Sequence, residues 1–296
     1  MNTILNAMIT KQRKDFDLLA SGKTIPEDAG KGISAFYNLH YLKDNDPAHR
    51  LDLYCPNSAH LPPPVIVNIH GGGLIMGNKE FNQHFCMKLC KMGFMVFSLE
   101  YRLCPEATVF QQLDDIFAAL AYIEGMLPLL RAETGQCYLV GDSAGAMLAM
   151  YAAAIQRNPK LAKAAVVQPS SLEIRAMALI SGMFYTIRKD SIGLLLPKAF
   201  YGEHYKKHPF FPYLNPEHPE VTSHLPPCLL LTSKCDNLRS YSYNMAAAIK
   251  RNGSTCRLND YGSKNTLTHA FSVFDPELPE SKEAMKDILE FLLSYN

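Results

Sequence analysis

A five-residue motif near the middle of the chain has the residue types of a nucleophilic serine. The segment GDSAG at 141–145 fits the pattern G-x-S-x-G, in which small flanking residues allow a tight, strained turn that exposes the serine hydroxyl. It follows the short apolar run 137–140 and precedes an Ala- and Leu-rich segment at 144–156. A serine that only caps this helix would also fit, but the strand-to-helix setting favours Ser143 as a nucleophile.

A serine nucleophile needs two partners further along the chain. The free hydroxyl is a poor nucleophile at neutral pH, so it requires a base within hydrogen-bond reach and a carboxylate that orients the base. In a strand–turn–helix site of this kind the chain order is Ser, Asp, His. Asp236 follows the expected strand 228–232, and His269 follows the last expected strand of the chain. We therefore predict a catalytic triad of Ser143, Asp236 and His269.

Other acids and histidines fit these roles less well. Asp260 lies within the expected strand 256–261, and Asp275 lies beyond His269, which breaks the chain order. Four further histidines fall in or beside an expected insertion and are interpreted as surface or lid residues: His204, His208, His218 and His224.

Three glycines upstream could stabilise the negative charge that develops during attack on a carbonyl. The segment HGGG at 70–73 ends the apolar run VIVNI, and glycines there let backbone N–H groups approach a substrate. Fixed N–H donors at the developing oxyanion contribute about 3 kcal/mol or more each. We expect Gly72, Gly73 and Ala144 to donate. A simple turn or a phosphate loop would also use glycines, but no Lys-Ser/Thr pair follows, which disfavours a phosphate loop.

The elements that must position these residues alternate along the chain. From about Leu51 onward, β-rich runs alternate with helical patterns, which predicts a mostly parallel sheet covered by helices. The expected strands are 51–55, 64–70, 94–101, 137–140, 176–181, 228–232 and 256–261, and the expected helices lie around 85–92, 109–123, 144–156 and 285–292. We interpret residues 1–296 as a single α/β domain.

Two segments fall outside this alternation and are expected to cover the sheet. Residues 182–227 gather aromatic side chains among prolines and lysines, and we interpret them, with residues of about 1–50, as cap elements. The aromatic residues of the insertion either form its own small core or line an apolar substrate pocket. They are Phe184, Tyr185, Phe200, Tyr201, Tyr205, Phe210, Phe211 and Tyr213.

Composition excludes several other classes of function. The chain has 296 residues with 29 Lys and Arg against 28 Asp and Glu, and no basic block that would bind nucleic acid. Its eight cysteines lack the CxxC spacing of a zinc site, and most of them are expected to be buried thiols in a reducing compartment. No apolar run of about 20 residues predicts a membrane span, and the charged N-terminus does not fit a signal peptide. The expected location is the cytoplasm.

Together the motifs resemble the bacterial hormone-sensitive-lipase-like esterases of the α/β-hydrolase superfamily. The similarity covers roughly residues 50–295 and is carried by HGGG at 70–73, YRLCPE at 101–106, GDSAG at 141–145 and the neighbourhoods of Asp236 and His269. The resemblance implies an α/β-hydrolase fold with a cap, a Ser-Asp-His triad, and an oxyanion hole at Gly72, Gly73 and Ala144. It also implies that Tyr101, Arg102, Pro105 and Glu106 support the catalytic loops.

The chain departs from that family at three loop positions. Ser233 stands where the family commonly has glycine, Asn237 where it often has proline, and Ala270 where glycine often follows the histidine. The departures leave the triad side chains in place. The segment LDLYCP at 51–56 also resembles esterases related to feruloyl and acetyl-sugar esterases.

The expected function is that of a serine carboxylesterase acting on small or short-acyl esters through an acyl-enzyme intermediate. This chemistry requires no metal or organic cofactor, and the expected partner is a small-molecule ester. An amidase or peptidase using the same triad is an alternative, since fold does not fix the substrate. A catalytically silent homologue that binds a ligand is another, against which the complete set of catalytic residues argues.

Overall fold

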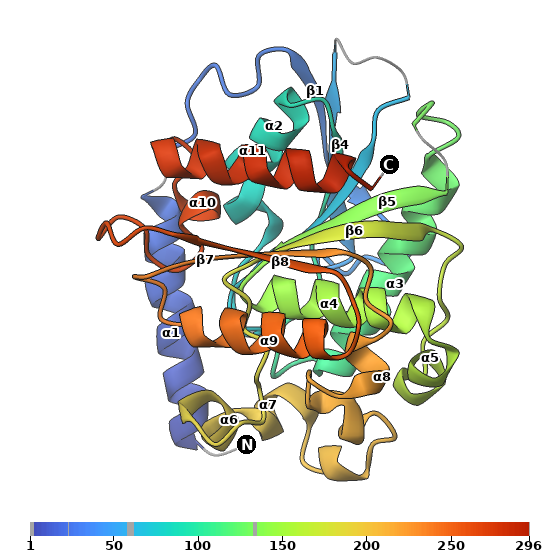
Figure 1. Ribbon diagram of the computed structural model, residues 1–296, viewed down its shortest axis with the longest axis vertical. Helices are drawn as coiled ribbons and strands as arrows, with labels where there is room; N and C mark the ends of the chain where they lie inside the picture. The colour runs from blue at the N-terminus through green and yellow to red at the C-terminus, as the bar shows by residue number, and fades with distance from the viewer. Residues whose placement is uncertain (1–2, 23, 58–61, 133–134, 296) are drawn as a thin grey trace.

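The computed structural model describes residues 3–295 apart from 23, 58–61 and 133–134. In this part of the chain eight strands form one sheet in the order β1-β2-β4-β3-β5-β6-β7-β8 (Figure 1). The strands are β1 (Ile33–His40), β2 (Arg50–Pro56), β3 (Val65–Ile69), β4 (Met95–Leu99), β5 (Gln136–Asp142), β6 (Glu173–Ile180), β7 (Cys228–Ser233) and β8 (Cys256–Tyr261). β2 pairs antiparallel with both β1 and β4. All neighbours from β4 through β3, β5, β6 and β7 to β8 pair parallel. The expected α/β-hydrolase sheet is confirmed.

Helices cover both faces of the sheet. The principal helices are α1 (Thr3–Ser21), α2 (Gln83–Lys91), α3 (Val109–Met126), α4 (Ala144–Arg157), α5 (Pro159–Ala165), α9 (Arg239–Arg251), α10 (Phe271–Phe274) and α11 (Pro279–Leu293). α2, α10 and α11 lie on one face, and α3, α4 and α9 lie on the other (Figure 1). The four expected helices are all present, with longer bounds.

The strands alternate their side chains between two cores. On β5, Leu139 packs with α3 and α4, whereas Tyr138 and Val140 pack with α2 and α11. Successive side chains of a strand point to opposite faces, so a strand with helices on both faces is apolar throughout. Residues 144–155 of α4 are all buried, and this fixes the helix that follows the motif serine.

The insertion at 182–227 carries α6 (Ser191–Leu195), α7 (Pro197–Tyr201), α8 (Pro219–Thr222) and the 3-10 helices η2 (Tyr205–Lys207) and η3 (Phe211–Leu214). Its aromatic side chains pack on the main domain. The ring of Phe210 lies 5.6 Å from that of Tyr151 on α4, and the Tyr151 hydroxyl donates to the carbonyl of Tyr213 at 2.9 Å. Tyr201 packs against Phe110 of α3. The insertion therefore shares the core of the sheet instead of forming its own.

The N-terminal region contributes both a helix and a strand. On α1, Arg13 donates from Nε to the carbonyl of Ile75 at 2.6 Å and from a terminal nitrogen to the carbonyl of Cys104 at 2.8 Å. It also forms an ion pair with Glu106 at 2.6 Å. Residues 33–40, expected in a cap element, instead form edge strand β1 of the sheet. Most β1 side chains are at least partly exposed, so an apolar pattern does not mark this strand.

The structure bears on two expectations from composition, the burial of the cysteines and the lack of a membrane-spanning helix in the described residues. All eight cysteines are free thiols, and five of them are buried. Burial raises the pKa of Cys90 to about 12, so this thiol stays protonated at neutral pH. None of the helices in the described residues has the length and apolar character needed to cross a bilayer.

The two-sided core predicts a large cost for truncating a strand side chain. Leu139 is fully buried, and Leu139→Ala should lower the free energy of unfolding by about 2–5 kcal/mol because it removes apolar contacts and leaves a cavity. Leu129, which is 83% exposed, provides the matched control, and Leu129→Ala should stay within about 0.5 kcal/mol of the parent. Urea unfolding measures both. Equal effects of the two substitutions would contradict the assigned burial.

Candidate active site

The motif serine sits in a strained turn between β5 and α4. Ser143 has φ 51° and ψ −116°, a region that non-glycine residues avoid unless the surroundings hold them there. Its N–H donates to the carbonyl of Ile180 at 2.8 Å, and its carbonyl accepts from the N–H of Met183 at 2.9 Å. The end of β6 therefore fixes the serine backbone on both sides.

The flanking glycines are required by packing. A Cβ on Gly145 would lie 2.0 Å from the carbonyl oxygen of Ile69, and a Cβ on Gly141 would lie 2.6 Å from the backbone of Gly145. Both values are below any real Cβ contact. The start of α4 thus packs directly against the end of β3, and only glycine permits this approach.

The expected acid and base lie in contact. Nδ1 of His269 is 2.8 Å from Oδ1 of Asp236. The same carboxylate accepts from the N–H of Leu238 at 2.9 Å and from the hydroxyl of Thr232 at 2.8 Å. Burial opposes ionisation of Asp236, but the hydrogen bond and positive charge of His269, with the Leu238 N–H, outweigh it and hold the pKa below its usual value. The carboxylate is therefore charged at neutral pH and orients the imidazole.

The base and the serine are tied to consecutive residues at the end of β6. Ile180 accepts the N–H of Ser143, and the next residue, Ser181, accepts the N–H of Ala270 at 3.0 Å through its hydroxyl. His269, the neighbour of Ala270, is partly exposed, with 24% of its side chain accessible. Since Nδ1 is committed to Asp236, Nε2 is the nitrogen left to exchange a proton.

The glycine loop after β3 lies against the serine turn. A Cβ on Gly71 would be 3.0 Å from Cβ of Ser143 and 2.3 Å from Oδ2 of Asp142. Gly72 and Gly73 have φ of 115° and 61°, values that suit glycine. Within the described residues the N–H groups of Gly72 and Gly73 have no hydrogen-bond acceptor, and the N–H of Ala144 begins α4, where no acceptor exists within the helix.

His70 is a buried structural residue. Its Nδ1 lies 2.7 Å from the carbonyl of Gly71 and its Nε2 lies 3.1 Å from a carboxylate oxygen of Glu100. Burial lowers the pKa of His70, but the charge of Glu100 and the two acceptors outweigh it and raise the pKa. Tyr101 stacks on the ring at 4.3 Å and donates its hydroxyl to the His70 carbonyl at 2.8 Å. These contacts fix the base of the glycine loop.

A buried polar network joins the glycine loop to the serine turn. Oδ1 of Asp142 accepts from the N–H of Gly71 at 3.0 Å and from Nδ2 of Asn82 at 2.8 Å. Asn82 also donates to Oδ1 of Asn68 on β3 at 3.1 Å. Burial raises the pKa of Asp142, against the opposing effects of Asn82 and of the nearby charges of His70 and His269. Asp142 and Asn82 therefore set the spacing between the serine and the backbone donors.

The structure brings the predicted site residues together and places the alternative acids and histidines elsewhere. The structure places Asp236 and His269 in hydrogen-bond contact and packs the glycine loop on Ser143. The alternative acids lie elsewhere: Asp260 pairs with Arg239, and Asp275 lines a neighbouring pocket. Of the other histidines, His208 stacks on Phe110 and His218 caps α8.

The sequence reasoning missed the residues that support these groups. Ser181 accepts from the N–H next to His269, and Thr232 donates to Asp236. Asn82 donates to Asp142, which holds the glycine loop. Ser181 and Thr232 are the last residues of two expected strands, and this position at the strand ends could have identified them. Asn82 carried no signal, because it meets its partners only after folding. In the described residues no group of three or more His, Cys, Asp or Glu side chains is placed to hold a metal ion.

The chain is similar to several known proteins. Residues 66–272 match the model of a family described as alpha/beta hydrolase fold. A probable isoprenylcysteine alpha-carbonyl methylesterase of Oryza sativa subsp. japonica is 27% identical over 155 residues, covering 51% of this chain and 37% of the relative. A probable isoprenylcysteine alpha-carbonyl methylesterase of Arabidopsis thaliana is 26% identical over 273 residues, covering 88% and 57%. The chain thus spans less than two thirds of the length of either relative.

A solved structure agrees with the fold. Esterase B from Lactobacillus Rhamnosis superimposes with a TM-score of 0.88 at 23% sequence identity, covering 99% of this chain and 96% of that chain. At this identity the likeness describes the fold alone. The overall fold of the chain is therefore shared with this solved structure.

The contact between α4 and β3 generates a first prediction for the site. Gly145→Ala should lower the free energy of unfolding by about 1–3 kcal/mol because the added methyl group forces the backbone apart. Gly125 on α3 is the matched control, since a Cβ there meets nothing within 4 Å. Gly125→Ala should leave stability unchanged or raise it by about 0.4–1 kcal/mol. Thermal and urea unfolding measure both variants. An unchanged free energy of unfolding for Gly145→Ala would contradict the close packing of α4 on β3.

A second prediction concerns the buried amide of Asn82. Asn82→Ala should lower kcat for a test ester by about 10- to 100-fold with little change in KM, because losing its hydrogen bond to Asp142 shifts the glycine loop relative to Ser143. Asn252→Ala is the control, since the side-chain amide of Asn252 donates to Glu217 and Thr222 of the insertion. Steady-state kinetics on folded variants tests this. A kcat equal to that of the control would count against the positioning role.

Proposed function

The chain belongs to the alpha/beta hydrolase fold family, and on that premise we propose that it is a serine carboxylesterase for small or short-acyl carboxylic esters. The observation that carries the proposal is that the strained Ser143 turn and the hydrogen-bonded pair of Asp236 and His269 are tied to consecutive residues, Ile180 and Ser181. The named activity of the curated relatives, a methylesterase, supports an ester over an amide as the bond that is cleaved.

The proposed reaction begins with attack by Ser143. Its Oγ adds to the ester carbonyl carbon while Nε2 of His269 takes the hydroxyl proton. The ionised Asp236 stabilises the imidazolium that forms and holds the ring through Nδ1. The bond between the carbonyl carbon and the alcohol oxygen then breaks, and His269 returns the proton to the leaving alcohol.

Negative charge on the substrate oxygen would be met by backbone donors. The N–H groups of Gly72, Gly73 and Ala144 are proposed as the oxyanion hole, supported by their lack of other acceptors among the described residues and at the start of α4. Fixed donors of this kind act in the transition state without reorganisation. The rigid attachment of Gly71 to Asp142 keeps the loop in position.

Water completes the proposed cycle. His269 removes a proton from a water molecule as its oxygen attacks the acyl-enzyme carbonyl. The tetrahedral intermediate collapses to the carboxylic acid, and the proton passes to Oγ of Ser143. Each step uses only side chains, backbone groups and water.

The surroundings of this site are part of the proposal. We take residues 1–296 as one catalytic domain and propose that helix α1 and the insertion 182–227 form its cap, since residues 33–40 belong to the sheet. The anchoring of α1 by Arg13 and the packing of the insertion on α3 and α4 support this assignment. The eight free thiols support a reducing compartment, and we propose the cytoplasm.

Substitution of the serine tests the proposed function directly. Ser143→Ala should reduce hydrolysis of a short p-nitrophenyl ester by about 10⁴-fold or more and abolish covalent labelling by a fluorophosphonate probe. Ser223→Ala, at an exposed serine of the cap, should retain activity and labelling. Ordinary turnover by Ser143→Ala would overturn the scheme.

A matched amide should be hydrolysed far more slowly than the ester by the parent protein.

A further inference from the structure

A pocket of about 370 Å³ lies beside the proposed catalytic loops. Its lining comes from residues 24–26 after α1, from residues 273–277 after His269, and from five residues after the glycine loop: Asn78, Glu80, Phe81, Gln83 and His84. The volume is at the lower end of the range for small-molecule sites. The pocket is thus walled by the segments that follow two catalytic loops.

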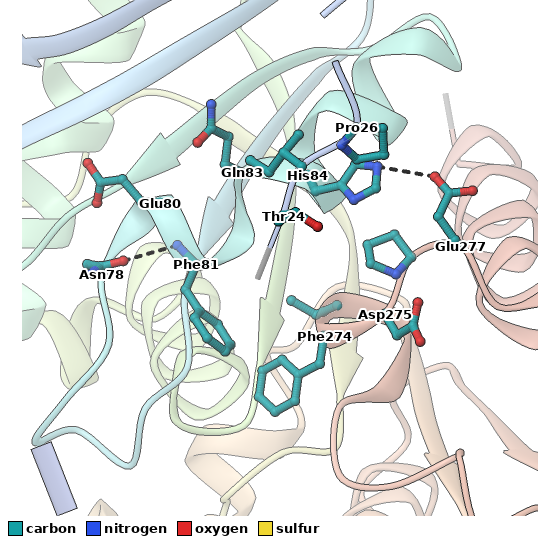
Figure 2. Close-up of a pocket in the computed structure, with 13 residues that line it drawn as sticks. Thr24, Pro26, Asn78, Glu80, Phe81, Gln83, His84, Phe274, Asp275 and Glu277 are labelled. Atoms are coloured by element: carbon teal, nitrogen blue, oxygen red, sulfur yellow. Dashed lines mark hydrogen bonds and ion pairs between the residues drawn. The ribbon is translucent and has the colours of Figure 1, made fainter. Parts of the chain in front are cut away.

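One wall of the pocket is an aromatic pair. The rings of Phe81 and Phe274 lie 4.9 Å apart at 83°, an edge-to-face arrangement, and Figure 2 shows them together at one end of the pocket. Phe16 of α1 packs on Phe81 at 4.5 Å. The N–H of Phe81 donates to Asn78 at 3.0 Å, which fixes this segment. The wall is therefore a preformed aromatic surface.

The same wall reaches the proposed base. The ring centroids of Phe274 and His269 are 6.4 Å apart with an interplanar angle of 69°. In ester hydrolysis the base gives its proton to the leaving alcohol oxygen, so the alcohol half of the substrate must lie on the side of His269. Phe274 lines the pocket and also lies near the ring of His269, so the pocket is on that side.

The opposite end of the pocket is polar. Nε2 of His84 lies 3.2 Å from a carboxylate oxygen of Glu277, and Figure 2 shows this pair across the pocket from the two rings. Lys88 and Lys282 also contact Glu277 and lower its pKa to about 2. Gln83 and Asn78 add amide groups to the lining. The pocket therefore offers an aromatic wall at one end and hydrogen-bonding groups at the other.

We propose that this pocket binds the alcohol half of the substrate and selects an aromatic alcohol, phenolic or benzylic, that carries a polar substituent. A ring fits against the edge-to-face pair of Phe81 and Phe274 because aromatic rings attract one another in that geometry. The substituent then faces the end lined by His84 and Gln83. The inference rests on the proposed esterase function and assigns Phe81 and Phe274 as specificity-determining residues.

Two ester series separate the alcohol half from the acyl half. The first keeps the acetyl group and changes the alcohol from ethanol to phenol to 4-hydroxyphenol, and the second keeps ethanol and lengthens the acyl chain. Because a phenol leaves more readily than ethanol, each variant is compared with the parent on the same substrate. The variants are Phe274→Leu and Phe81→Leu, and Phe36→Leu, at a residue 50% exposed on β1, is the matched control.

Phe274→Leu and Phe81→Leu should raise KM for the aryl acetates about three- to tenfold and leave KM for ethyl acetate within about twofold of the parent. The Phe36→Leu protein should match the parent on every ester. Equal losses on aryl and ethyl acetates would overturn the subsite, and so would losses that follow acyl length.

A binding measurement distinguishes failure of this inference from failure of the proposed function. Calorimetry of 4-hydroxyphenol with the Ser143→Ala protein should show saturable binding that Phe274→Leu weakens. If the parent hydrolyses esters and this binding is absent, the subsite is wrong and the esterase function stands. If the parent hydrolyses none of the esters, the proposed function fails and the assignment of a leaving-group subsite fails with it.

Discussion

The close approach of α4 to the end of β3 is the contact on which the site depends. Gly145 allows the backbones to meet at Ile69, and Ser143, two residues earlier, is held in a strained conformation. Strain of this kind persists only where the surrounding structure over-determines it. Here α4 is buried along almost its whole length, and the end of β6 holds the serine from the other side. The core of the sheet thus stabilises a turn that would not persist alone.

Burying polar groups around that turn carries a free-energy cost that the network largely offsets. Asp236 accepts hydrogen bonds from His269, Leu238 and Thr232, which compensate for its removal from water. Asp142 is less well satisfied, since its Oδ2 has no hydrogen-bond partner among the described residues. An unsatisfied buried oxygen is tolerated where it maintains geometry, and here it lies next to the glycine loop that the proposed oxyanion hole requires.

The sequence predicted the family, the sheet and the contact between acid and base, because each leaves a local signal. Parallel strands buried on both faces read as apolar runs, and the ends of those strands locate Asp236 and His269. Edge strand β1 left no such signal, since most of its side chains are at least partly exposed. Asn82 and the pair of Phe81 and Phe274 were also missed. Their roles arise from contacts between segments distant in the chain, which spacing alone does not reveal.

The clamp made by Arg13 has a consequence for how the chain folds during synthesis. Its acceptors lie 62 residues later at Ile75, 91 later at Cys104 and 93 later at Glu106. Helix α1 is made before any of them, and most of the stability of a helix in a protein comes from tertiary packing. It therefore docks after the loops it contacts have been made and arranged. Helix α1 therefore reaches its final place only after residues about 60 to 90 positions further along the chain have been made.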